Sequence, residues 1–220
     1  MPDPVEIVTG ESAGRALGAV LVLVGALLLG AATFTPWYAI DTQHVSAMPP
    51  NFPHSFFDTA YYLGPPWSDH TVRHSCTAGV SCPGDASYSN DSRNSTGVVT
   101  EVVLALVYAA IALGLLAGAI GLVFRRDPGW GPAVIALSAA TLVLGAAAPA
   151  LYGASFQFGH YGPQSSFLGT AGNVNTLGRW TTSWGPASGW YLAIGAAAAV
   201  LAGVALLAYR WGDRAEPAPS

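Results

Sequence analysis

Trp184-Gly-Pro-Ala-Ser-Gly-Trp190-Tyr191 opens the last long apolar run of the chain, Leu192–Tyr209, which holds no charged residue. Arg210, Trp211 and Arg214 follow this run directly. An aromatic belt before an apolar segment and arginines after it are typical of a helix that crosses a lipid bilayer. The stretch therefore predicts a transmembrane helix, and it decides the class of the protein.

The same pattern occurs three more times upstream, so we expect four transmembrane spans. Their predicted positions are residues 14–36, 98–124, 133–152 and 190–209. The short segment 125–132 between the second and third spans makes these two an antiparallel hairpin. A cleaved signal peptide is the alternative for the first span, because Gly30-Ala31-Ala32 is small enough to be cut. A retained anchor is favoured, since the apolar stretch is longer than the roughly 7–15 residues of a signal peptide and the leader before it is acidic.

The composition agrees with a membrane protein. Of 220 residues, 52% are hydrophobic and only 9% are charged, whereas about a quarter of a soluble domain is charged. Lysine is absent, and the formal net charge of −4 leaves no basic face. Nucleic acid is therefore not expected as a partner.

Arginine placement predicts the orientation. Five arginines lie near one set of span ends, namely Arg15, Arg125, Arg126, Arg210 and Arg214. Positive charge close to span ends marks the cytoplasmic side. We therefore expect a cell-membrane protein with a cytoplasmic tail at 1–13, a cytoplasmic turn at 125–132 and a cytoplasmic tail at 210–220. Extracytoplasmic loops are expected at 37–97 and 153–189.

The first outer loop is too rich in Pro, Gly, Ser and His to be embedded in the membrane. Its aromatic residues argue for a folded segment, because disordered segments contain few aromatics. A short β-structure around Phe56–Leu63 is expected, limited by prolines at positions 49, 50, 53, 65 and 66. The predicted fold is an all-α integral membrane protein, a bundle of four transmembrane helices with a small extracytoplasmic cap from both loops.

Small residues recur at four-residue spacing inside the spans, as in Gly14-x-x-x-Gly18 and Gly114-x-x-x-Gly118. This spacing lets helix backbones approach closely in lipid and indicates a compact bundle. Pro149, near the outer end of the third span, is expected to kink or end that helix.

The interiors of the spans contain no Asp, Glu, Lys, Arg or His, and Glu101 lies near the outer end of the second span. Ion and proton paths usually require such groups, so a pump or proton-coupled transporter is disfavoured. Glu101 is interpreted as a carboxylate that stabilises the amino end of a helix. No nucleophile, phosphate-loop or paired-carboxylate motif is present, so we expect neither an enzyme nor a cofactor.

The two cysteines, Cys76 and Cys82, both lie in the first outer loop and have two interpretations. An even pair outside the cytoplasm usually forms a disulfide, which is the favoured interpretation. Alternatively, His70, His74, Cys76 and Cys82 form a zinc or copper site of two imidazoles and two thiolates, in which the histidines share a face if the segment is helical. Three further histidines in the outer loops, available to such a site, are His44, His54 and His160.

Asn90-Asp-Ser92 and Asn94-Ser-Thr96 are glycosylation sequons in the same loop. They predict glycosylation at Asn90 and Asn94, which agrees with an extracytoplasmic position for this loop.

Three features of the chain occur together: Thr35-Pro-Trp-Tyr38, the Ser-rich outer loop with its sequons, and Trp184-Gly-Pro-Ala-Ser-Gly-Trp-Tyr-Leu-Ala193. In this combination the chain resembles a group of uncharacterised four-span membrane proteins from archaea. The resemblance implies a membrane location and no known activity. The chain is also similar in architecture to claudin-like tetraspan proteins, which share a long first outer loop and a cysteine pair after a tryptophan. It departs from them in lacking a Gly-Leu-Trp element and in the spacing of Trp67, Cys76 and Cys82.

The first functional hypothesis is a non-enzymatic structural or interaction protein, an accessory subunit that contacts other membrane-protein subunits or itself. Its expected contact residues are aromatic and lie in the first loop: Phe56, Phe57, Tyr61, Tyr62 and Trp67. The second hypothesis is extracytoplasmic binding of a metal or small ligand through the histidines and cysteines. A conduit for lipid or solute is the third.

Overall fold

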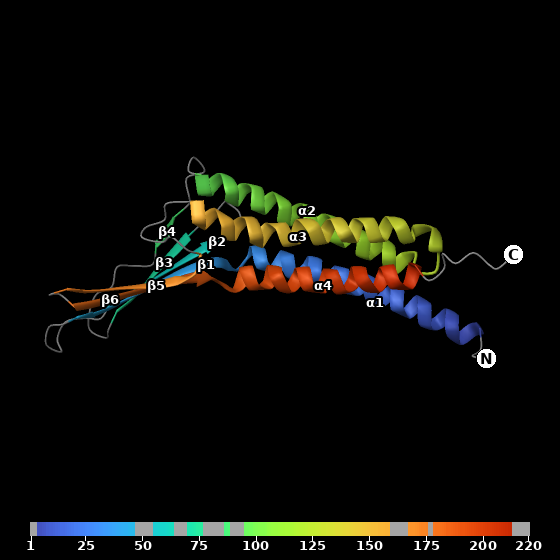
Figure 1. Cartoon of the computed structure of the whole chain (residues 1–220), viewed down its shortest axis with the longest axis horizontal. Coiled ribbons are helices and arrows are strands. Elements are labelled where there is room, and N and C mark those ends of the chain that lie inside the picture. Colours follow the sequence, from blue (N-terminus) through green and yellow to red (C-terminus); the bar gives the residue numbers. More distant parts are fainter. Residues whose placement is uncertain are drawn as a thin grey trace. The chain divides into compact units, whose positions relative to one another are not determined.

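The computed structural model describes residues 4–46, 55–63, 70–76, 86–88, 95–158, 167–175 and 178–212. The chain is mostly helical, with four long helices and one sheet (Figure 1). The helices are α1 (Pro4–Thr33), α2 (Ser95–Val123), α3 (Gly131–Phe158) and α4 (Ser188–Gly212), and a 3-10 turn, η1 (Pro128–Trp130), joins α2 to α3.

Each of the four helices is long and apolar enough to cross a membrane, which confirms the prediction of four apolar spans. The segments with this property are Ser12–Thr33, Val99–Val123, Pro128–Ala154 and Ser188–Trp211. α1 begins at Pro4, well before the apolar segment, so the helix extends into the predicted tail. Proline is well placed in the first turn of a helix because that turn does not use its N–H groups.

The chain folds as two compact units. The helical unit comprises Met1–Ala31, Ala105–Ala148 and Leu192–Ser220. The sheet unit comprises Ala32–Leu104 and Pro149–Tyr191, and it includes one end of each long helix.

In the helical unit, glycines let α1 lie close to both α2 and α4. A Cβ added to Gly18 would lie 2.7 Å from the Leu207 side chain of α4, and one added to Gly118 of α2 would lie 2.3 Å from that of Leu23. The glycines of the two four-residue motifs therefore pack within one chain, as the expectation of a compact bundle requires. α3 continues through Pro149 to Phe158, so this proline does not end the helix.

The sheet unit contains a six-stranded antiparallel sheet with the order β4-β3-β2-β1-β6-β5. Four strands come from the first loop and two from the second: β1 (Pro36–Ser46), β2 (Ser55–Tyr62), β3 (His70–Cys76), β4 (Ala86–Tyr88), β5 (Gly169–Asn175) and β6 (Gly178–Pro186). β1 and β6 join the two loops through a continuous register from Tyr38↔Pro186 to Ser46↔Gly178.

The all-α prediction is therefore incomplete, because the two loops form a sheet. β2 confirms the short β-structure predicted around Phe56–Leu63, but it is one of six strands, and the other five were not predicted. The prolines that suggested the limit lie outside the described residues. β1 follows α1 almost directly, and the sequence did not predict it, because Trp37 and Tyr38 directly after an apolar span are typical of a membrane interface.

Candidate functional site

Three of the four predicted metal-site residues lie on β3. His70, His74 and Cys76 belong to this strand, whereas Cys82 lies outside the described residues. The segment is extended rather than helical, and four residues along a strand span about 13 Å, whereas the same four in a helix form roughly one turn. The side chains of these residues lie outside the description, so both the metal site and the disulfide remain predictions.

The other predicted sites fall in the same part of the chain. Phe56, Phe57, Tyr61 and Tyr62 are residues of β2, and His44 is a residue of β1 opposite Trp180. Their side chains also lie outside the description. The remaining predicted residues lie wholly outside the described ranges: His54, Trp67, Asn90, Asn94 and His160.

An aromatic cluster ties the sheet to the helix ends within the sheet unit. Trp37 and Tyr38 are both fully buried, and a register shift between Pro36 and Tyr38 places the β-bulge at Trp37. A bulge redirects side chains, which explains how two successive residues of one strand can both be buried. Trp37 lies edge-on to Tyr152 of α3 with ring centroids 5.4 Å apart.

Two indole N–H groups fix this cluster to helix backbones. Trp37 Nε1 donates to the Ala32 carbonyl at 2.7 Å, and Trp190 Nε1 donates to the Pro149 carbonyl at 3.0 Å. A Cβ at Gly189 would lie 2.5 Å from Trp37, so only glycine lets α4 begin this close to β1. The two aromatic segments of the sequence, Thr35–Tyr38 and Trp184–Tyr191, thus contribute to one cluster, in which buried aromatics provide large apolar contact areas.

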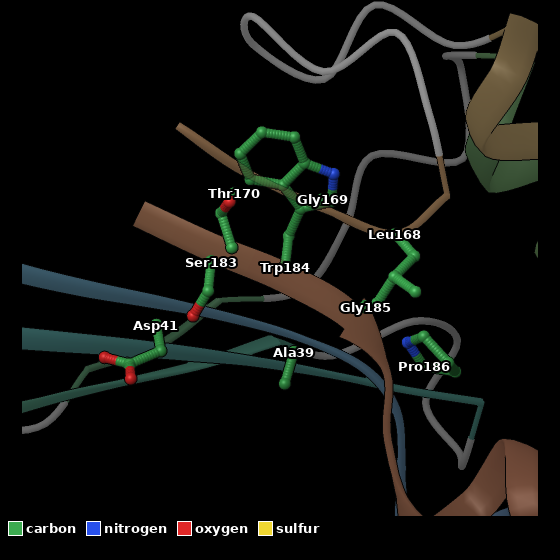
Figure 2. Close-up of a pocket in the computed structure, with 9 residues that line it drawn as sticks. All are labelled: Ala39, Asp41, Leu168, Gly169, Thr170, Ser183, Trp184, Gly185 and Pro186. Atoms are coloured by element: carbon green, nitrogen blue, oxygen red, sulfur yellow. The ribbon is translucent and has the colours of Figure 1, made fainter. Parts of the chain in front are cut away.

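A shallow open groove of about 320 Å³ crosses one face of β1, β6 and the start of β5 (Figure 2). One row of the register across these strands is Asp41, Ser183 and Thr170. The next row pairs Ala39 with Gly185, and the Leu168 side chain lies over Gly185, since a Cβ there would come within 2.6 Å of Leu168 Cδ1. The groove therefore has a polar row beside an apolar row.

Among the residues that the structure describes, Asp41 is the one ionisable residue in the groove lining. It is half-buried, and its Oδ2 accepts a hydrogen bond from Gln43 Nε2 at 3.3 Å. Continuing along the same register, Asp58 of β2 is opposite Asp41, and Arg73 of β3 is opposite Asp58. The one basic residue of this row is therefore aligned with Asp58 and not with Asp41.

The two ends of the sheet differ. β4 has only three residues, whereas β5 pairs with β6 over seven residues and has no second neighbour among the described strands. The β5 sequence, Gly-Thr-Ala-Gly-Asn-Val-Asn, contains no charge and no proline. Val174 is 75% exposed, and Leu168, just before the strand, is 69% exposed. β5 thus lacks the charges and prolines that commonly prevent pairing at an exposed sheet edge.

In the helical unit, a buried arginine joins three helices. Arg15 of α1 is 2% exposed and donates to the carbonyls of Arg125, just after α2, and of Arg210 in α4, both at 3.3 Å. Its guanidinium also lies 5.2 Å from the ring centroid of Trp211. From the sequence, Arg15 indicated only the orientation of the chain in the membrane. Its role in joining helices was not predicted, because its acceptors are more than 100 residues away in the chain.

A scan of the chain against models of known protein families and a search of characterised proteins found no match.

Proposed function

We propose that the protein is a non-enzymatic, multi-pass membrane protein that acts as a structural or accessory subunit through an extracytoplasmic cap formed by its sheet. The termini lie in the cytoplasm in this proposal. The resemblance of Thr35–Tyr38 and Trp184–Ala193 to segments of four-span archaeal membrane proteins supports a membrane location.

The exposed edge of β5 is the observation that carries this proposal. A strand with one free side presents a row of backbone donors and acceptors, which a strand of a partner protein can complete. β4 at the other end offers only three residues, so β5 is the longer edge of the described sheet. The contact would add to the partner surface expected at Phe56, Phe57, Tyr61, Tyr62 and Trp67.

The test places a positive charge on the edge. Val174→Lys adds an ammonium group that loses hydration when a further strand pairs with β5, so the complex should dissociate. Because Val174 is exposed, the fold of the chain should be retained. We expect the protein extracted from its own membranes in mild detergent to be larger than one chain, and Val174→Lys to shift it toward a single chain in native mass spectrometry.

Gln43→Lys is the matched control. Gln43 is also exposed and uncharged, but it lies on β1, which pairs with strands on both sides. Its substitution should leave the assembly unchanged. A native protein that is already a single chain, or a Val174→Lys variant with unaltered assembly, would contradict pairing at this edge.

A further inference from the structure

The groove on β1, β6 and β5 contains groups suited to a ligand other than a protein strand. Asp41, Ser183 and Thr170 are directly aligned in the register of three neighbouring strands. With strands about 4.8 Å apart, this row presents a carboxylate and two hydroxyls over roughly 10 Å. A carboxylate accepts hydrogen bonds, and each hydroxyl both donates and accepts them.

The adjoining row supplies an apolar floor. Ala39 and Gly185 carry little or no side chain, and Leu168 and Pro186 form the rim beside them (Figure 2). Trp184, between Ser183 and Gly185 on the strand, is 8% exposed and points its indole away from Ser183 (Figure 2). The volume of about 320 Å³ is at the small end of the range for ligand sites.

The lining residues discriminate between classes of ligand. An anion would meet the carboxylate of Asp41, and the described part of the lining supplies no basic residue to offset it. A purely apolar ligand would leave a carboxylate and two hydroxyls without hydrogen-bond partners, which is costly. A divalent cation prefers six or more oxygen ligands, whereas the lining offers one carboxylate and two hydroxyls.

We propose that this groove binds a saccharide. A sugar ring presents several hydroxyls along one edge and C–H groups on its face. The hydroxyls donate to Asp41 and exchange hydrogen bonds with Ser183 and Thr170, while the C–H face packs on Ala39, Gly185 and Leu168. The site does not require the strand pairing proposed for β5, since Val174 is not among its lining residues.

The test measures binding of methyl glycosides of glucose, mannose, galactose and N-acetylglucosamine to the full chain in lipid nanodiscs by saturation-transfer NMR and calorimetry. At least one glycoside should bind. Asp41→Asn should weaken it about tenfold or more, because the neutral amide is a weaker acceptor than a carboxylate and replaces one acceptor oxygen with a donor. Gly185→Ala should also weaken binding, because the new methyl group occupies space at the base of the groove. The fold should be retained, since the exposed, flexible Leu168 side chain can move away from this methyl group.

Matched controls separate the groove from general effects on folding. Glu101→Gln makes the same carboxylate-to-amide change at a residue of the sheet unit that does not line the groove. Gly172→Ala makes the same glycine-to-alanine change on β5 outside the groove, where the added Cβ meets only an ordinary contact of 3.4 Å. Both should bind like the native chain.

Three results would overturn the proposal: no glycoside binding up to tens of millimolar, glycoside binding that Asp41→Asn and Gly185→Ala leave unchanged, or saturable binding of spermidine or calcium in place of any glycoside. Native mass spectrometry of the same variants distinguishes this result from the assembly test. Loss of glycoside binding should leave the mass of the assembly unchanged, whereas loss of strand pairing at β5 should lower it.

Discussion

At the scale of a residue, Arg15 shows how a charge near a span end can be part of the packed interior. Its planar guanidinium reaches the carbonyls of Arg125 and Arg210 at once, while its Cζ lies over the Trp211 ring. Carbonyls at the carboxyl end of a helix have no partner within the helix and carry partial negative charge. Arg15 therefore links α1 to the ends of α2 and α4.

Arg15→Ala should lower the free energy of unfolding by about 2–3 kcal/mol, because hydrogen bonds to a charged group are lost and two acceptors lose a partner. Arg15→Lys should restore only part of this, since an ammonium group cannot reproduce the planar fork. Denaturant titration in detergent, followed by circular dichroism, measures the difference. Arg126→Ala, at an exposed turn residue, should change stability by no more than about 0.5 kcal/mol; an equal loss in both alanine variants would contradict a specific role for Arg15.

At the scale of an element, α4 carries one glycine that is packed and one that is open. A Cβ at Gly203 would lie 2.8 Å from the Gly18 carbonyl oxygen and 2.9 Å from Val22, whereas one at Gly195 would meet nothing within 4 Å. Backbone atoms of a neighbouring helix cannot move aside as a flexible side chain can. The same substitution should therefore have opposite effects at two positions of one helix.

Gly203→Ala should destabilise the protein by about 1–3 kcal/mol through overpacking between α1 and α4. Gly195→Ala should be neutral or stabilising by up to about 1 kcal/mol, because alanine is the better helix former. Thermal unfolding of the two variants in the same detergent measures both effects. A Gly203→Ala variant as stable as Gly195→Ala would mean that α1 and α4 do not approach as closely as the glycine contacts require.

At the scale of the whole molecule, the proposed orientation places both loops outside and both tails inside. Cys76 and Cys82 are the only cysteines. In intact cells, a membrane-impermeant maleimide should label them only after treatment with an impermeant reductant, because they are predicted to form a disulfide in the oxidising space. Labelling is read by the mass shift of the purified protein.

The control uses a chain in which both cysteines are replaced by serine and the tail carries Ser220→Cys. This variant should react only after the cells are permeabilised. Labelling of the tail in intact cells would overturn the orientation, and labelling of the native cysteines without reductant would overturn the disulfide but leave the orientation intact.

The pattern of apolar residues was enough to predict the four apolar helices. Runs of apolar residues bounded by aromatics and arginines have only one stable solution in lipid, a helix that satisfies its own backbone. The two glycine motifs likewise indicated close helix packing, although which helices they join was not readable from spacing. Gly18 and Gly118 face α4 and α1 respectively, and this depends on how the chain folds back on itself.

The sheet and its surfaces, in contrast, depend on how distant segments of the chain come together. β1 and β6 are separated by more than 130 residues, so their pairing leaves no local signal in either segment. The groove has the same origin, because Asp41, Ser183 and Thr170 are ordinary loop residues in the sequence and become a row only through the register of three strands. β5 pairs on one side only among the described strands because it stands at the end of the strand order, which the sequence of β5 itself does not reveal. The local sequence pattern is sufficient to predict the helices, because each helix satisfies its own backbone hydrogen bonds. A sheet instead requires hydrogen-bond partners from distant parts of the chain.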